Sequence, residues 1–234
     1  MGRAVRVDVA GRAYHVLNRS VGRRMLFRKD ADFAAFERVL AEAVDRSAGA
    51  VDLLAYCVMG NHWHLVVFTH EDGALSPFMK WLTLTHTQRY RAAHGNVGEG
   101  PVYQGRFKSF IIEHETHLLR VCRYVERNAA RAGLVERAED WRWSSLWRSR
   151  HGGGVADEDL PLVLSDWPVP GGRPRQWLRT VNTPLSAGEL EALRRATQRC
   201  QPYGRAAWVA EQIERFGLHS TVRRPGRPKR RDQP

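Results

Sequence analysis

The sequence has few of the features that build a disulfide scaffold, a secreted protein or a membrane protein. It contains three cysteines, at positions 57, 122 and 200, and none belongs to a CxxC pair. A disulfide framework or a Cys-based zinc site needs more cysteines at closer spacing. No run approaches the roughly 18 apolar residues that span a membrane, and the first residues lack the apolar segment of a signal peptide. We therefore expect a cytoplasmic protein that binds no membrane.

Acidic residues are scarce relative to basic ones. The 234 residues include 37 Lys and Arg against 25 Asp and Glu, which gives a formal net charge of +12. Such an excess favours a polyanionic partner, because cations that neutralise phosphates release condensed counterions. An arginine-rich codon usage would give the same excess, so charge alone does not identify the partner. The chain is 43% apolar, which is enough for a sizeable core and argues against disorder throughout.

Hydrophobic periodicity predicts an α+β fold. Apolar segments of strand length lie over 12–19, 51–59, 62–69 and 102–113. Helical spacing of apolar residues is found over 30–47, 77–93 and 118–131. The order β-α-β-β-α-β, followed by one more helix, is the split βαβ arrangement of ferredoxin-like and RRM-like folds. We expect an antiparallel sheet with helices on one face.

The composition changes near residue 150. We interpret residues 1–150 as the main domain and residues 151–184, which are rich in Gly and Pro, as a linker. Ser186 and Glu189 form a capping-box pattern that opens a helical segment over 185–218. Residues 219–234 are basic and have little to bury, which predicts a disordered tail.

His62 and His64 lie at the start of the strand expected over 62–69. Side chains two residues apart on a strand point to the same face, so the two imidazoles can hold one metal ion while Trp63 packs on the other face. An HxH pattern is weak on its own, since paired histidines on strands are more often surface or hydrogen-bonded residues.

The helix expected over 118–131 carries a basic stripe around one tyrosine. Tyr124 and Asn128 are one turn apart on this helix. Four arginines surround them, at positions 120, 123, 127 and 131. The arginines suit a phosphate group, and the Tyr124 hydroxyl and the Asn128 amide could both face it. The alternative is a tyrosine that lies along a solvated basic face and forms only a hydrogen bond.

Five segments of the chain together resemble a known family. They are YHVLNR at 14–19, YCVMGNHWHLV at 56–66, YQGRFKSF at 103–110, YVERNAARAGLV at 124–135 and WRWSSL at 141–146. They are similar to the motifs of the REP-associated tyrosine transposases, within the single-tyrosine HUH transposase superfamily. The resemblance is dense over 11–150 and resumes weakly over 204–230.

The resemblance implies a site and a reaction. His62 and His64 match the two histidine ligands of the family's metal, Mg²⁺ or Mn²⁺, and Asn128 stands where relatives carry the Gln or Asn that completes the site. Tyr124 matches the nucleophile. The implied activity is cleavage and rejoining of single-stranded DNA at hairpin-forming palindromes through a 5′-phosphotyrosine intermediate. The expected partner is the single-stranded foot and duplex stem of such hairpins, bound in the nucleoid by a monomer, with a homodimer as the alternative.

We expect further DNA contacts from cations on the fourth strand, on the tyrosine helix and in the tail. These residues are Arg106, Lys108, Arg120, Arg127, Arg131, Arg224, Arg227, Lys229 and Arg230. The tail resembles an AT-hook, which reads the narrow minor groove of A·T-rich DNA, and a nonspecific phosphate-binding tail is the equal alternative. Trp141, Trp143 and Trp147 could stack on bases, but packing in the core is the more common role.

Two other functions stay open at this stage. One is a domesticated, catalytically silent DNA-binding protein that regulates repeat elements. The other is an RNA-binding module, because RRM domains share the predicted topology, although they need no histidine pair. No general base stands out: His114, His117 and Glu126 fit on spacing only, and we expect each of them at the surface.

Overall fold

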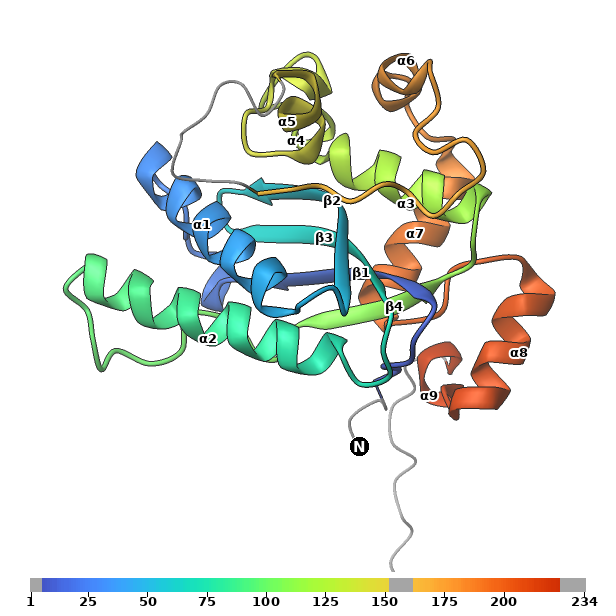
Figure 1. Cartoon of the computed structure of the whole chain (residues 1–234), viewed down its shortest axis with the longest axis horizontal. Helices are drawn as coiled ribbons and strands as arrows, with labels where there is room; N and C mark the ends of the chain where they lie inside the picture. The colour runs from blue at the N-terminus through green and yellow to red at the C-terminus, as the bar shows by residue number, and fades with distance from the viewer. Residues whose placement is uncertain (1–5, 152–161, 224–234) are drawn as a thin grey trace, which may run out of the picture.

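A four-stranded antiparallel sheet forms the centre of the molecule (Figure 1). The computed structural model describes residues 6–151 and 162–223. The strand order is β2-β3-β1-β4. The strands are β1 (Arg12–Arg19), β2 (Val51–Met59), β3 (His62–Thr69) and β4 (Lys108–Ile112). This confirms the α+β, ferredoxin-like sheet, and the bounds of β1, β2 and β3 are those expected from the sequence.

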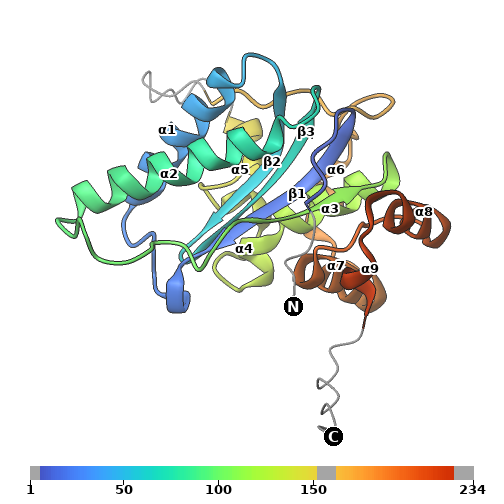
Figure 2. The same ribbon diagram turned by 90° about the horizontal axis from the view of Figure 1, so that it is seen from below.

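Helices α1 (Asp30–Arg46) and α2 (Leu75–Ala93) cover one face of the sheet (Figure 2). Trp63 points to this face and stacks on Phe36, with ring centroids 5.6 Å apart. Its burial is complete, as the alternation of side chains along β3 predicts.

The start of α2 differs from the prediction. The helix begins at Leu75 rather than at residue 77. The carboxylate of Asp8 accepts hydrogen bonds from the backbone N–H groups of Leu75 (2.9 Å) and Ser76 (2.8 Å). A carboxylate at this position satisfies free N–H groups and complements the positive end of the helix dipole. The cap therefore comes from a residue about 67 positions earlier in the chain, which local sequence signals do not reveal.

Further helices cover the opposite face, so the expectation of helices on one face only was wrong. They include α3 (Thr116–Glu126) and α4 (Asn128–Arg131), which together replace the single helix expected over 118–131. Arg127, with φ −84° and ψ 2°, separates them. The apolar side of α3 packs against the sheet through Val121, Cys122 and Val125, which are fully buried.

The segment interpreted as a linker belongs to the folded body. We call residues 162–186 the strap. The strap contains α6 (Trp177–Asn182), and it binds the outer edge of β2, where Ser165 N donates to the Leu53 carbonyl and Trp167 Nε1 donates to the Leu54 carbonyl, both at 2.9 Å. Trp167 and Trp177 are buried, with their rings edge to face at 4.8 Å. Part of the predicted linker, residues 152–161, lies outside the described residues.

The last strand is shorter than the predicted 102–113. Tyr103 bridges Ser20, and the pairing then breaks before β4 begins at Lys108. Side chains replace the ladder in between: Asn18 Nδ2 donates to the Gly105 carbonyl at 3.2 Å. Arg106 therefore lies outside β4, although we expected it on the fourth strand with Lys108.

The C-terminal helical extension is present. It consists of α7 (Ala187–Arg199), α8 (Ala206–Phe216) and α9 (His219–Val222). Ser186 caps α7 through the expected capping box with Glu189. Between α7 and α8, Tyr203 pairs with the outer edge of β4, donating to Ile111 at 3.0 Å and accepting from Glu113 at 2.9 Å. The predicted tail thus begins with a short helix, and residues 224–234 lie outside the described part.

The remaining elements are short. They are the 3-10 turns η1 (Val21–Arg23) and η2 (Ala138–Asp140) and the helix α5 (Ser145–His151). Two of the tryptophans in this region pack, as expected: Trp143 stacks on Phe33 at 4.9 Å, and Trp141 donates to the Val58 carbonyl at 2.9 Å. Within residues 6–151 and 162–223, no helix has the length and apolarity needed to cross a bilayer.

Candidate active site

The two histidines of the HxH pattern share one face of β3. Their ring centroids are 5.1 Å apart, and the rings are close to perpendicular. This face is the one that α3 covers, because Trp63 occupies the other. His64 lies inside the protein, with 3% of its surface exposed, while His62 is more accessible.

Tyr124 reaches the same place from α3. Its ring centroid lies 6.0 Å from that of His64 and 6.1 Å from that of His15, nearly perpendicular to both. The phenol ring is buried, with 6% of the residue exposed. The predicted nucleophile and the predicted metal ligands therefore meet on one side of the sheet within a single chain.

Hydrogen bonds fix the orientation of both imidazoles. His62 Nδ1 lies 2.7 Å from Asn61 Oδ1, and His64 Nδ1 lies 2.8 Å from His15 Nε2. Each contact occupies the Nδ1 atom and leaves Nε2 as the ring atom that can bind a metal. A partner on the second nitrogen is the usual arrangement for metal-binding histidines. The donor chemistry of the pair therefore fits a divalent cation.

Sequence reasoning missed His15. It lies on β1 and is completely buried, with its ring stacked parallel to that of His64 at a centroid distance of 5.0 Å. The signal available in the sequence was its place in the YHVLNR segment, on a strand of buried apolar residues. Its contact with His64 depends on β1 lying beside β3, where Leu17 is paired with His64.

The surroundings keep these imidazoles neutral. Burial, followed by the positive charges of Arg19 and Arg131, lowers the pKa of His62 to about 4. Burial is also the main cause that lowers the pKa of His64 well below its ordinary value. A histidine must be neutral to coordinate a metal, so at neutral pH both rings are in the binding form.

Asn128 and Arg131 form a second group beside the tyrosine. The Arg131 guanidinium carbon lies 5.2 Å from the centre of the Tyr124 ring, and its Nη2 donates to Asn128 Oδ1. Asn128 is buried, and its Nδ2 has no hydrogen-bond partner among the described residues. In this structure the amide oxygen is therefore engaged by Arg131 rather than free.

The metal site is incomplete without an amide, water or substrate oxygen. Within the described part of the chain, no three His, Cys, Asp or Glu side chains are grouped so that they could hold a metal. Two imidazoles alone leave most of the positions around a six-coordinate cation such as Mg²⁺ unfilled.

A basic cleft of about 780 Å³ opens beside His62. Its lining includes four cations, Arg19, Arg23, Arg106 and Lys108. No Asp or Glu is among the described residues that line it, and α7 contributes Thr197 and Gln198. Arg19 and Arg23 were not among the predicted DNA contacts. The cleft thus places positive charge and amide groups next to the histidine pair.

The arginines predicted on the tyrosine helix have different surroundings. Arg120 forms an ion pair with Glu189 at 3.0 Å, and Arg123 Nε donates to the Thr183 carbonyl at 3.1 Å. Arg127 Nε is buried with no partner in the described structure. Of the predicted DNA contacts, Arg224, Arg227, Lys229 and Arg230 lie outside the described residues.

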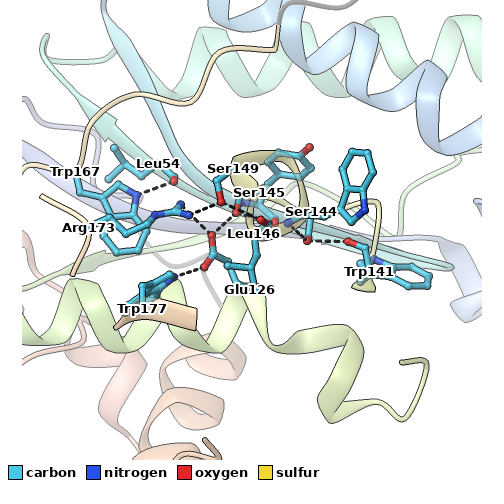
Figure 3. Close-up of polar contacts among 12 residues, drawn as sticks. Leu54, Glu126, Trp141, Ser144, Ser145, Leu146, Ser149, Trp167, Arg173 and Trp177 are labelled. Carbon is cyan, nitrogen blue, oxygen red and sulfur yellow. Dashed lines mark hydrogen bonds and ion pairs between the residues drawn. The ribbon is translucent and has the colours of Figure 1, made fainter. Parts of the chain in front are cut away.

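One candidate base, Glu126, is not the surface residue we expected, and a second, His117, is partly buried. Glu126 is completely buried and bonded to Ser145, Arg173 and Trp177 (Figure 3). His117 is paired with Glu113, at 3.2 Å, near the N-terminus of α3. Neither residue is engaged with Tyr124.

Comparisons with known proteins give one similar fold and a family. A solved REP-associated tyrosine transposase bound to a REP hairpin matches with a TM-score of 0.53 and 17% sequence identity, over 72% of this chain and 96% of the other. A putative transposase from Deinococcus radiodurans R1 matches with a TM-score of 0.38 and 16% identity, over 54% of this chain and 95% of the other. No curated protein matches in sequence. The family model described as "Transposase IS200 like" matches residues 8–128, more than half of the chain, which therefore belongs to the IS200-like transposase family.

Proposed function

We propose that the protein is a metal-dependent tyrosine transposase that cleaves and rejoins single-stranded DNA at hairpin-forming palindromic repeats. The observation that carries the proposal is the distance of 6.0 Å between the rings of Tyr124 and His64. Family membership and the REP hairpin bound by the structural neighbour support the same substrate class.

The reaction is a transesterification at phosphorus. The Tyr124 oxygen forms a bond to phosphorus, the bond from phosphorus to the 3′ oxygen breaks, and that oxygen gains a proton as the phenol loses one. The 5′ end stays on the tyrosine as a phosphodiester, so attack by another 3′-hydroxyl rejoins DNA without ATP. A phenol has an ordinary pKa of about 10. The Arg131 cation lies beside the ring, where it would offset negative charge that develops in the transition state.

His62 and His64 would hold the cation through their Nε2 atoms. The chemistry that Mg²⁺ or Mn²⁺ would supply there is withdrawal of charge from the phosphate in the transition state. Asn128 would add its amide oxygen after exchanging its contact with Arg131. The two imidazoles favour Mn²⁺, because Mg²⁺ prefers oxygen ligands.

The basic cleft beside His62 would receive the single-stranded foot. Its cations would neutralise backbone phosphates, and Gln104 and Gln198 offer amides for base edges. The predicted contacts in the tail would hold the duplex stem. Since one chain supplies both Tyr124 and the histidines, we propose that a monomer is the active form and that it acts in the nucleoid, on DNA.

A labelled hairpin with a single-stranded foot tests the proposal. Wild type should form a covalent adduct with Mn²⁺ or Mg²⁺ that survives a denaturing gel, whereas Tyr124→Phe should bind the hairpin without forming one. Tyr90→Phe is the matched control, because Tyr90 lies on α2, across the sheet. If wild type binds but forms no adduct with either metal, the protein is a catalytically silent DNA-binding member of the family. An adduct with Tyr124→Phe would exclude Tyr124 as the nucleophile.

A further inference from the structure

One side of α3 is attached to the C-terminal part of the chain. Three residues spaced three apart make the attachment, so they lie on one side of the helix. Arg120 pairs with Glu189 on α7 at 3.0 Å, and Arg123 donates to the carbonyls of Thr183 and Pro184 in the strap. Glu126, at the end of α3, makes the third and only fully buried attachment.

Glu126 is held by three donors. Its Oε1 accepts hydrogen bonds from Ser145 Oγ at 2.7 Å and from Arg173 Nη2 at 3.2 Å, and its Oε2 accepts one from Trp177 Nε1 at 2.6 Å (Figure 3). Arg173 and Trp177 belong to the strap. A carboxylate with no exposed surface is stable only when it is paired in this way.

The contacts continue from Arg173 to the edge of the sheet. Arg173 Nη1 donates to Ser149 Oγ at 2.6 Å, and its guanidinium carbon lies 4.7 Å from the centre of the Trp167 ring. Trp167 in turn donates to the Leu54 carbonyl on β2 (Figure 3). β2 pairs directly with β3, where Met59 is opposite His62. A continuous set of contacts therefore joins the helix of Tyr124 to β2, the strand that pairs with the histidine strand β3.

We propose that the strap is a positioning element for the nucleophile, and that Arg173 and Trp177 act through Glu126 to set where α3, and with it Tyr124, lies relative to His62 and His64. The proposal rests on the proposed function. Glu126 is two residues from Tyr124, so a shift at the buried carboxylate moves the phenol with the helix. In-line attack depends steeply on position, and a displacement of about 1 Å can lower a rate about 100-fold.

A second buried pair provides a matched control. Arg148 Nη2 binds Glu37 Oε2 at 3.0 Å, and Tyr56 donates to the same carboxylate at 2.6 Å. Glu37 is also buried, but it lies on α1, on the opposite side of the sheet from α3. Loss of either arginine leaves an uncompensated buried carboxylate, so the two changes should destabilise the protein to a similar degree.

The experiment compares Arg173→Gln, Arg173→Lys and Arg148→Gln in the full-length protein with Mn²⁺ and a saturating labelled hairpin. Arg173→Gln should lower the single-turnover rate of adduct formation about 100-fold while the hairpin dissociation constant stays within about twofold. Arg173→Lys should recover part of the rate, because it restores the charge. Arg148→Gln should lower the melting temperature but leave the rate close to that of wild type. Assays run well below each melting temperature keep the variants folded.

The outcomes separate this inference from the proposed function. If wild type forms no adduct, the proposed function fails and the positioning role fails with it. If wild type reacts and Arg173→Gln reacts equally fast, or if Arg148→Gln slows the reaction as much as Arg173→Gln, only the positioning role is refuted. Should Arg173→Gln not fold, Trp177→Phe removes the 2.6 Å indole contact while keeping an aromatic ring, and it should still slow the saturating rate with unchanged binding.

Discussion

Replacing His15 should weaken metal binding without removing a metal ligand. Among residues 6–151 and 162–223, His15 makes the only hydrogen bond to the His64 ring; His15 Nε2 and His64 Nδ1 lie 2.8 Å apart, and both residues are buried. In His15→Leu the His64 ring loses the partner that fixes its rotation and its tautomer. Loss of such an outer partner typically costs about 10- to 100-fold in metal affinity. We therefore expect Mn²⁺ to bind about 10- to 100-fold more weakly, which corresponds to about 1.4–2.8 kcal/mol.

Calorimetric titration of Mn²⁺ into the DNA-free protein measures this change. His15→Gln should recover most of the affinity, because its amide oxygen can accept the Nδ1–H of His64. His86→Leu is the matched control: His86 is also buried, bonded to the Tyr103 hydroxyl at 2.7 Å, and lies on the other face of the sheet. The reasoning is refuted if His15→Leu binds Mn²⁺ as tightly as wild type, or if His86→Leu weakens binding equally.

Three further predictions concern stability and DNA binding. Burial lowers the pKa of His15 to about 3 and that of His86 to about 4, so below pH 6.5 the unfolded chain binds protons that the folded chain does not, and stability falls. Between pH 7 and pH 5, each of the two histidines should lower the free energy of unfolding by about 2 kcal/mol, measured by urea titration. A free energy of unfolding that stays constant over this pH range would contradict the pKa shifts. Arg23→Ala and Lys108→Ala should each weaken hairpin binding and reduce the slope of log affinity against log salt concentration by about 0.7–0.9, measured by fluorescence anisotropy. Unchanged slopes would show that the cleft does not contact DNA phosphates. Trp167→Ala should lower the free energy of unfolding by about 3–5 kcal/mol, and a much smaller loss would show that the strap contributes little to the fold.

The central sheet could be predicted because its signals are local. A Gly-Asn turn separates β2 from β3, and alternation along β3 places His62 and His64 together, so these features follow from residues next to one another. The break before β4 did not show in the sequence, because it depends on Asn18 reaching the Gly105 carbonyl from another strand. The end of α3 at Arg127 was missed for a related reason, since a run of good helix formers hides the change in backbone direction.

The candidate site shows the same division between local and distant signals. Tyr124 and the histidine pair were found from motifs, whereas His15 and Glu126 gain their partners only when β1 lies beside β3 and the strap lies on α3. The strap itself was read as a linker because its Gly and Pro content dominates the local signal. Its two tryptophans, Trp167 and Trp177, indicated a folded segment instead, since large aromatic residues seldom occur in solvated linkers.

Both outer strands of the sheet are completed by chain that follows residue 140. Ser144, Ser145 and the strap take up hydrogen bonds along β2, and Tyr203 does so along β4. A fragment cut at the boundary suggested by the motifs, near residue 150, would keep the β2 contacts of Ser144 and Ser145. It would lose the partners of the Leu53 and Leu54 carbonyls on β2 and of the Ile111 carbonyl on β4. Unpaired strand edges recruit other chains, so such a fragment would be prone to aggregate during expression. We therefore expect the motif region to fold poorly on its own, and protein engineering of this transposase should keep the chain intact through Tyr203.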